Sequence, residues 1–275
     1  MNNTLMAGKK GIVMGVANDR SIAYGIAQSL IEAGAEVGLS YQGDALAGRL
    51  EKLAPKLNNA WYAPCDVGDP EAVAEFFAAV EERFGKIDFL VHAIAFSDKS
   101  ELRGMYLDTS RENFRQTMDI SVYSLLEVTR AARGILNEGA SILTLSYYGA
   151  EKMIPNYNVM GVAKAALEAS VRYLAADLGG LGIRVNALSA GPMRTLAASG
   201  IGQFKDMLRW HELNAPLERN VSLEDVGGAG LYLLSPLSGA VTGEVHHVDS
   251  GSNVRGMIDK DKAEECEVIA GRLAG

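Results

Sequence analysis

The sequence contains few of the features that mark several large classes of protein. Only two of its 275 residues are cysteine, Cys65 and Cys266, and they lie 201 positions apart. So few cysteines, without the close spacing of a zinc site, exclude a disulfide scaffold. Proline is also scarce, at 7 residues, which argues against a proline-rich disordered chain. We therefore expect a folded protein of a reducing compartment, the cytoplasm.

Long apolar runs and an excess of positive charge are missing as well. The longest stretch without a charged residue, 226–243, holds five glycines and Pro236, which makes it a poor membrane span. The N-terminal residues lack the regions of a secretory signal. Lys and Arg number 26 against 34 Asp and Glu, for a formal charge of −8. We therefore expect neither a membrane nor a nucleic acid as a partner.

The sequence does contain a regular alternation of two hydrophobic patterns. Short apolar runs are typical of buried strands, and they alternate with segments whose apolar residues recur at helical spacing. The strands are predicted at residues 9–15, 36–41, 59–64, 86–94, 141–146, 182–189 and 244–249. The helices are predicted at 21–34, 43–57, 69–84, about 109–136, 157–179, 202–213 and 222–235.

This alternation predicts an α/β fold, with a Rossmann-type doubly wound parallel sheet of about seven strands. No second periodic block remains, so we expect a single dinucleotide-binding catalytic domain over 1–275. The residues from about 259 onward are polar and are expected to form a loosely ordered tail. Ligands of such sheets bind beyond the carboxyl ends of the strands, so the residues that follow each strand are the candidates for a site.

The turn after the first strand is a candidate phosphate site. Gly15 would let a ligand approach the backbone, and a helix that begins near Ser21 and Ile22 would present free N–H groups to a pyrophosphate. The usual G-x-G-x-x-G spacing is absent, so an ordinary turn with Ser21 as the helix cap is an equal alternative. Gln42 follows the second strand, and no Lys or Arg is near it in sequence. NADH is therefore favoured over NADPH, whose 2′-phosphate needs a basic residue there.

Two further strand ends carry candidates. Asp66 and Val67 follow the third strand, where they would face an adenine, although Asp66 as a helix cap is the alternative. Ile94 follows the fourth strand and would pack beside a cofactor ribose, or else belong to the core. His92 is expected to be a buried histidine with its hydrogen bonds satisfied rather than a base.

Tyr157 and Lys164 form the main candidate for chemistry. Seven positions along a helix turn about 700°, close to two full turns, so both side chains share one face. A phenol can donate a hydrogen bond to a developing oxyanion, and a nearby ammonium would favour that role and hold ribose hydroxyls. Gly161 between them would leave clearance for a ligand. The alternative is a surface pair on an amphipathic helix.

In combination these motifs resemble the short-chain dehydrogenase/reductase superfamily. The glycine turn, Asp-Val after the third strand, Tyr and Lys on one helix, and Pro-Met-Arg-Thr at 192–195 carry the resemblance. Most members have Tyr-x3-Lys, whereas this chain has Tyr-x6-Lys with Tyr147 ten residues before Tyr157. That departure resembles the divergent branch of bacterial enoyl-acyl-carrier-protein reductases. The most specific stretches are GVANDRSIAYGIA, LTLSYYGAEKMIPNYNVMGVAKAALEA and RVNALSAGPMRTLAASGI.

The resemblance implies NADH as cofactor, no metal, and three sets of site residues. The catalytic residues would be Tyr147, Tyr157 and Lys164. The cofactor would contact Gly15, Ser21, Ile22, Gln42, Asp66, Val67, Ile94, Lys164, Met193, Arg194, Thr195, Leu196 and Ala197. The substrate would contact Ser97, Tyr147, Tyr157, Ile201, Phe204 and Met207.

The implied reaction is hydride transfer from NADH to C3 of a trans-2-enoyl thioester carried by acyl carrier protein. Tyr157 would stabilise the enolate, and C2 would be protonated afterwards. One alternative is a carbonyl (3-oxoacyl) reductase of the same superfamily, which the Tyr-x6-Lys spacing disfavours. Another is a non-catalytic NAD-binding sensor, which would not need Tyr147, Tyr157 and Lys164 together.

Two surfaces complete these expectations. Residues 197–213 would form a flap over the acyl chain, or else a plain amphipathic helix. Because the carrier protein is acidic, docking on a chain of charge −8 needs a local basic patch, for which Arg194, Lys205 and Arg209 are the candidates.

The resemblance implies a homotetramer, and an apolar row on helix 157–179 is either core or subunit interface. The row consists of Met160, Leu167, Val171, Leu174 and Leu178.

Overall fold

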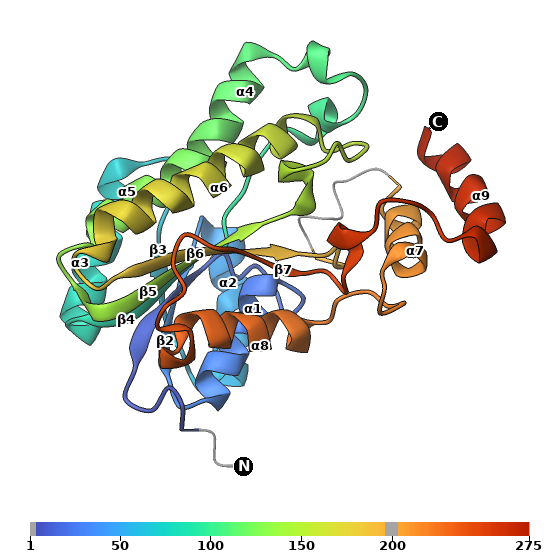
Figure 1. Ribbon diagram of the computed structural model, residues 1–275. Coiled ribbons are helices and arrows are strands. Elements are labelled where there is room, and N and C mark those ends of the chain that lie inside the picture. The colour runs from blue at the N-terminus through green and yellow to red at the C-terminus, as the bar shows by residue number, and fades with distance from the viewer. Residues whose placement is uncertain (1–3, 196–202, 275) are drawn as a thin grey trace.

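The computed structural model describes residues 4–195 and 203–274. Its centre is a seven-stranded parallel sheet in the order β3-β2-β1-β4-β5-β6-β7 (Figure 1). The strands are β1 Lys10–Met14, β2 Glu36–Tyr41, β3 Trp61–Pro64, β4 Ile87–His92, β5 Leu136–Ser146, β6 Arg184–Ala190 and β7 Val245–Val248. The chain starts in the middle, winds to one edge and then to the other, which confirms the predicted doubly wound Rossmann-type sheet.

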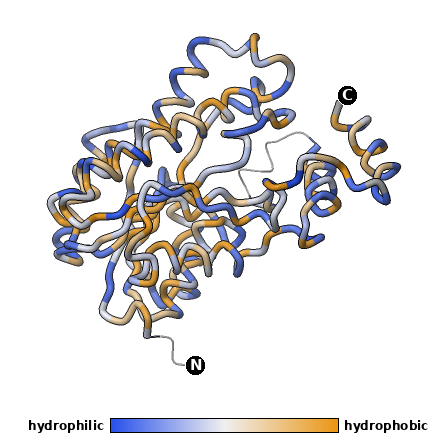
Figure 2. Tube along the Cα trace, viewed as in Figure 1, coloured by the Kyte–Doolittle hydropathy of each residue, from blue (hydrophilic) through white to orange (hydrophobic). Residues whose placement is uncertain are grey.

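Helices cover both faces of this sheet (Figure 1). They are α1 Ile22–Glu32, α2 Asp44–Leu53, α3 Pro70–Phe84, α4 Arg111–Met118, α5 Ser124–Ala132, α6 Asn158–Gly179, α7 Phe204–Asn214, α8 Leu223–Leu234 and α9 Ala263–Ala274. One apolar core joins the sheet to α1, α2 and α8, and a second joins it to α3, α5 and α6. Figure 2 shows the apolar residues concentrated along the central strands. In the described part of the chain, no helix is long and apolar enough to cross a membrane.

The apolar row on α6, apart from Met160, belongs to the second core, whereas Met160 packs in a smaller cluster with Tyr157 and Leu102. Leu167 and Val171 are fully buried, Met160 and Leu178 nearly so, and Leu174 packs partly buried against the second core. Of the two possibilities for this row, packing within the chain is therefore the one that the structure shows.

The long helix expected at 109–136 is interrupted. A π-helical turn, Asp119–Tyr123, separates α4 from α5. Within it, the Ser121 hydroxyl accepts a hydrogen bond from the Phe96 N–H and donates one to the Phe96 carbonyl, both at 3.0 Å. The irregular turn therefore holds the loop that follows β4, as π-turns often do at functional sites.

The expectation of a loosely ordered C-terminal tail is wrong. Residues Ala263–Ala274 form α9, which packs against α7. Cys266 and Ile269 are fully buried there, against Leu213 and Trp210. Together with Leu273 they recur at helical spacing, and this apolar stripe is easily missed because it is only three residues long and charged residues interrupt it.

Helices α1 and α8 approach closely because glycines face each other across their contact. A Cβ on Gly227 would overlap the Ser29 hydroxyl and lie 2.7 Å from the Gly25 carbonyl oxygen. A Cβ on Gly25 would in turn lie 2.9 Å from the Leu223 carbonyl oxygen. Since α1 begins at the turn after β1, this contact fixes the position of the candidate phosphate site.

Substituting Gly227 with alanine should therefore destabilise the protein. We expect Gly227→Ala to lower the free energy of unfolding by about 1–3 kcal/mol, because overpacking forces the two helices apart. Gly228 is the matched control: it lies one residue on in α8, and nothing is within 4 Å of an added Cβ. Gly228→Ala should raise stability by about 0.5–1 kcal/mol through helix propensity. Urea denaturation measures both, and equal effects of the two variants would contradict this account.

Candidate active site

Every strand of the sheet runs in the same direction, so the segments that follow the strands meet at one edge. Six of these segments hold residues predicted for the site. They contribute Gly15 after β1, Gln42 after β2, Asp66 after β3, Ile94 after β4, Tyr147 after β5 and Met193 after β6. The structure therefore brings together residues that are spread over nearly 180 positions of the sequence.

The turn after β1 leaves the N-terminus of α1 uncapped. Ser21 stands at the N-cap position, but its hydroxyl accepts from the N–H groups of Ala17 and Asn18, at 3.1 and 2.9 Å, and donates to the Asn18 carbonyl. The alternative of Ser21 as the cap of its own helix is therefore wrong. The first N–H groups of α1, beginning at Ile22, have no capping side chain and form a site for an anion.

Gly15 cannot be replaced by a residue with a side chain, for a reason within the protein itself. Its φ of +92° lies in the left-handed region, and a Cβ there would overlap the Ala93 carbonyl. The glycine is required so that the turn after β1 can pack against the residue that follows β4. The approach of a ligand to the backbone at Gly15 stays a prediction.

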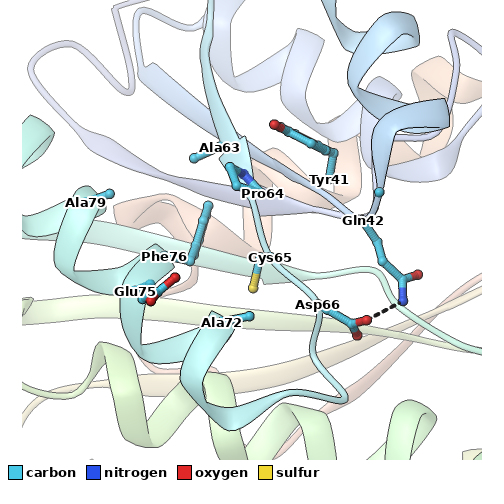
Figure 3. Close-up of a pocket in the computed structure, with 11 residues that line it drawn as sticks. Tyr41, Gln42, Ala63, Pro64, Cys65, Asp66, Ala72, Glu75, Phe76 and Ala79 are labelled. Atoms are coloured by element: carbon cyan, nitrogen blue, oxygen red, sulfur yellow. Dashed lines mark hydrogen bonds between the residues drawn. The ribbon is translucent and has the colours of Figure 1, made fainter.

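Gln42 and Asp66 are joined by a hydrogen bond. The Gln42 side-chain N–H donates to the Asp66 carboxylate at 2.8 Å (Figure 3). Asp66 also accepts from the Gly68 N–H at 2.9 Å. The helix that follows is capped by Asp69, whose carboxylate accepts from the Glu71 N–H, so the alternative of Asp66 as that cap is wrong.

A cavity of about 590 Å³ opens beside this pair, between the ends of β2 and β3 and helix α3 (Figure 3). Tyr41 and Phe76 supply apolar walls. Among the residues that the structure describes, no Lys or Arg lines it. Cys65 also lines it, but burial, with a smaller effect of Asp66, raises the pKa of the thiol to about 12. It is therefore not a nucleophile at neutral pH.

The segment after β4 is fixed by its own hydrogen bonds. The His92 ring lies 3.0 Å from the Thr144 hydroxyl and 2.8 Å from the Ser124 hydroxyl, and burial lowers its pKa to about 3. The prediction of a satisfied buried histidine is confirmed. The Ser97 hydroxyl, predicted to contact substrate, donates a hydrogen bond to Asn113 and accepts one from Thr117, so its hydrogen bonds are made within the protein.

Tyr157 and Lys164 are buried, and Tyr147 packs partly buried against Tyr157. The two tyrosine rings meet edge to face, with centroids 5.0 Å apart and an interplanar angle of 78°. Tyr157, just before α6, is 8% exposed and Lys164 is 6% exposed, so the surface-pair alternative is wrong. The Lys164 ammonium donates to the Leu145 carbonyl at the end of β5, at 2.7 Å.

Burial determines the protonation of all three groups. It raises the pKa of Tyr147 to about 12 and that of Tyr157, next to Tyr147, still further above its usual value. Both therefore remain phenols, and hydrogen-bond donors, at neutral pH. Burial also lowers the pKa of the Lys164 ammonium to about 8, against an opposing effect of Glu168.

Two glycines permit this packing, and one of them corrects an expectation. A Cβ on Gly161 would lie 2.8 Å from the Gly149 carbonyl oxygen, so the space at Gly161 is taken by backbone rather than left for a ligand. A Cβ on Gly149 would lie 2.5 Å from the Tyr157 ring. The short 3₁₀ turn Tyr148–Ala150 is thereby pressed between Tyr157 and α6.

Glu168 is a site residue that sequence reasoning missed. It lies one turn beyond Lys164 on α6, is buried, and accepts a 2.5 Å hydrogen bond from the Ser146 hydroxyl. Burial raises the pKa of its carboxyl. The available signal was its i+4 spacing from Lys164 on the buried face of the helix.

The loop after β6 borders a second cavity, of about 390 Å³. Met193 and Arg194 line it together with Leu208 of α7, and Arg20 lines it from the turn after β1. Arg20 was not predicted, although it precedes Ser21 directly. Thr195 is half-buried. Leu196, Ala197 and Ile201 lie outside the described residues, so nothing follows about them.

Helix α7 corresponds to the later part of the expected flap. Met207 and Leu208 are buried and Phe204 is partly buried, which is the pattern of an amphipathic helix. Lys205 is exposed, as a docking patch requires. Arg209 is not free for that purpose, because its guanidinium is paired with Glu265 and Glu212.

Among the described residues, no group of three or more His, Cys, Asp or Glu side chains is placed to hold a metal ion. The polar groups of this edge are instead a helix N-terminus, two arginines, an amide–carboxylate pair, two phenols and an ammonium. These suit an elongated anionic ligand with hydroxyl groups rather than a cation.

The comparisons with known proteins agree with this arrangement. Residues 15–253 match the family model described as Enoyl-(Acyl carrier protein) reductase. The chain is 65% identical to an enoyl-[acyl-carrier-protein] reductase [NADH] of Rhizobium meliloti, over 92% of this chain and 93% of the relative. It is 52% identical to the corresponding protein of Rickettsia felis, over 93% and 98%.

Solved structures show the same likeness. The enoyl-(acyl-carrier-protein) reductase of Anaplasma phagocytophilum, crystallised in complex with NAD, superposes with a TM-score of 0.90 at 52% identity, over 94% of this chain and 97% of that chain. FabI of Candidatus Liberibacter asiaticus gives a TM-score of 0.91 at 50% identity, over 94% and 100%.

The buried Lys164 ammonium should make stability depend on pH. Its folded pKa of about 8 lies below the ordinary lysine value of 10.5, so between these values the unfolded chain binds a proton that the folded chain does not. The cost of burying the charge is complete below pH 8 and disappears as the pH rises toward 10.5. Lys164→Met does not bear this cost. As the pH rises from 7.5 to 10.5, we expect wild type to gain about 3 kcal/mol of stability relative to the Lys164→Met variant.

Urea denaturation of both proteins over this pH range measures the difference. All other ionisable side chains are common to both proteins, so their contributions cancel in the difference. A difference that stays constant with pH would contradict the burial of the Lys164 charge.

Proposed function

Because the chain belongs to the enoyl-(acyl carrier protein) reductase family, we propose that it reduces trans-2-enoyl thioesters with NADH. The observation that carries the proposal is the packed pair of Tyr147 and buried Tyr157, with buried Lys164, at the edge of the sheet where the strand ends meet. The substrate would be an enoyl group carried on acyl carrier protein, as the names of the relatives state for them.

The residues at this edge fit a dinucleotide. The uncapped start of α1, with Arg20 and Arg194 nearby, suits the pyrophosphate. Gln42 and Asp66, beside the cavity without a basic lining residue, suit an adenosine whose 2′-hydroxyl is unphosphorylated. The Lys164 ammonium suits the hydroxyls of the second ribose, next to Ile94. When bound, NADH supplies the hydride.

Tyr157 would supply the main stabilisation of charge. As hydride reaches C3 of the enoyl group, negative charge develops on the thioester oxygen, and a phenol kept protonated by burial can donate a hydrogen bond to it. A donor in a site with little water is worth more than the same donor in solution. The Tyr147 ring, edge-on to Tyr157, restricts the orientation of that phenol.

Lys164 would act on both the cofactor and the phenol. Its bond to the Leu145 carbonyl holds the ammonium at the end of β5, and Glu168 one turn away supports its charge. A cation at this place attracts ribose hydroxyls and favours negative charge nearby.

We also infer a homotetramer in the cytoplasm. Both cysteines are free thiols, which suits a reducing compartment. Val162 and Tyr173 are exposed on α6 and lie eleven positions apart, so they share one face of the helix and leave an apolar strip for a subunit contact. Light scattering of the purified protein measures the mass of the assembly.

The oxidation of NADH at 340 nm tests the reaction. We expect turnover with crotonyl thioester and none with acetoacetyl thioester, because the proposed reduction occurs at a C=C bond. Turnover with acetoacetyl thioester alone would indicate a carbonyl reductase. Turnover with neither would indicate a dinucleotide sensor and refute the proposal.

The role of Tyr157 predicts a selective loss of turnover. Tyr157→Phe removes only the hydroxyl, and we expect kcat to fall about 10²–10³-fold while the affinity for NADH is kept. Lys164→Ala should mainly weaken NADH binding, because it removes the group that would hold the ribose. Steady-state kinetics and fluorescence titration of NADH separate these effects. Wild-type kcat in Tyr157→Phe would show that the phenol does not stabilise the transition state.

A further inference from the structure

Helix α9 covers one side of α7 (Figure 1). It begins ten residues after the end of the family match at residue 253, so it lies outside the matched part of the chain. Its apolar contacts are few. Cys266 and Ile269 are buried against Leu213, and Trp210 and Leu273 pack partly buried around them.

The contact is also electrostatic, and it includes one ion pair of each polarity. The Glu265 carboxylate receives two hydrogen bonds from the Arg209 guanidinium, at 2.6 and 3.0 Å. Arg272 pairs with Asp206 at 3.1 Å. The first turn of α9 is acidic, with Glu264 and Glu265, and Figure 2 shows polar and apolar residues alternating along the helix. With three glutamates and one arginine, α9 is on balance an acidic amphipathic helix.

The covered surface lies next to the candidate active site. On the same helix, Leu208 lines the second cavity together with Met193 and Arg194. Lys205 and Arg194 remain exposed on this side. For a chain of net charge −8, an acidic partner needs a local basic surface. The features that hold α9, an apolar strip at Trp210 and Leu213 beside Arg209, are those that an acidic helix of a partner would use.

We propose that α9 is an internal cover on the docking surface of α7, and that the acidic carrier protein displaces it to deliver its acyl group. The proposal rests on the proposed function, since it concerns the substrate's carrier. In both states an acidic amphipathic helix occupies the docking surface of α7. This helix is α9 in the free protein and a helix of the carrier in the complex.

The physical properties of α9 suit displacement. It has 12 residues, and a helix of that length has little stability in water without a docking surface. The side chains of Arg209 and Glu265 are 47% and 48% exposed, and an ion pair so open to solvent is weak. With only two side chains fully buried, α9 is held strongly enough to occupy the surface and weakly enough to leave it.

Two variants in the full chain loosen α9, and each has a matched control. Ile269→Asn places an amide in the apolar contact, and Glu265→Gln breaks the pair with Arg209. The controls are Val268→Asn, at a side chain that is 61% exposed, and Glu267→Gln, at an exposed carboxylate on the same helix. Each is assayed for NADH oxidation with crotonyl-CoA and with crotonyl-acyl carrier protein.

With the carrier-bound substrate, we expect kcat/KM to rise about two- to fivefold for Glu265→Gln and about tenfold for Ile269→Asn. With crotonyl-CoA it should not change, and both controls should match wild type. Adding Arg209→Gln to Ile269→Asn should remove the gain, because Arg209 is then the basic group that the carrier contacts. Circular dichroism confirms that each variant is folded.

Three results would overturn the proposal. These are an unchanged kcat/KM for the carrier-bound substrate in both loosening variants, an equal change with both substrates, and a gain that persists without Arg209. A fall with the carrier-bound substrate alone would also overturn it, because α9 would then be part of the docking surface. If wild type oxidised NADH with neither thioester, the proposed function itself would fail, and the inference with it.

Discussion

The structure depends on how one buried positive charge is accommodated. An ammonium taken out of water is costly unless polar groups surround it. Lys164 meets this requirement through the Leu145 carbonyl at the end of β5 and through Glu168 one turn along α6. Glu168 in turn holds the Ser146 hydroxyl. The charge therefore ties α6 to the end of β5. Tyr147 is the first residue after that strand.

Much of the fold could be predicted from the sequence because the spacing of apolar residues within a segment indicates whether that segment is a strand or a helix. The seven strands and their helices lie where apolar runs and helical spacing indicate, usually within two residues. The exceptions depend on contacts that are distant in sequence. Strand β5 begins at Leu136 rather than 141, the π-helical turn is held by Phe96, and α9 is ordered by its contact with α7. None of these partners is visible in the segment itself.

The candidate site likewise combines features that local sequence patterns predict with contacts between distant segments that they do not. Parallel strands guarantee that residues after their ends meet, and the helical spacing of Tyr157 and Lys164 predicts a shared face. What the individual residues contact was harder to infer. Gly15 and Gly161 each make room for a backbone carbonyl of another segment, where a ligand had been expected. Glu168 was missed because a glutamate on a helix usually faces solvent, and only the fold shows that this one faces the sheet.

The π-helical turn constrains how the chain can vary in length. A π-turn contains one residue more than an α-helical turn, and each residue rotates a helix by about 100°. Deleting one residue from 119–123 would make α4 and α5 continuous but rotate one against the other. Leu125 and Val128 would then leave the core, or Asn113 and Thr117 would leave Ser97. Insertions and deletions, which loops accept freely, are therefore excluded from this helical segment, although nothing in its composition distinguishes it from an ordinary helix.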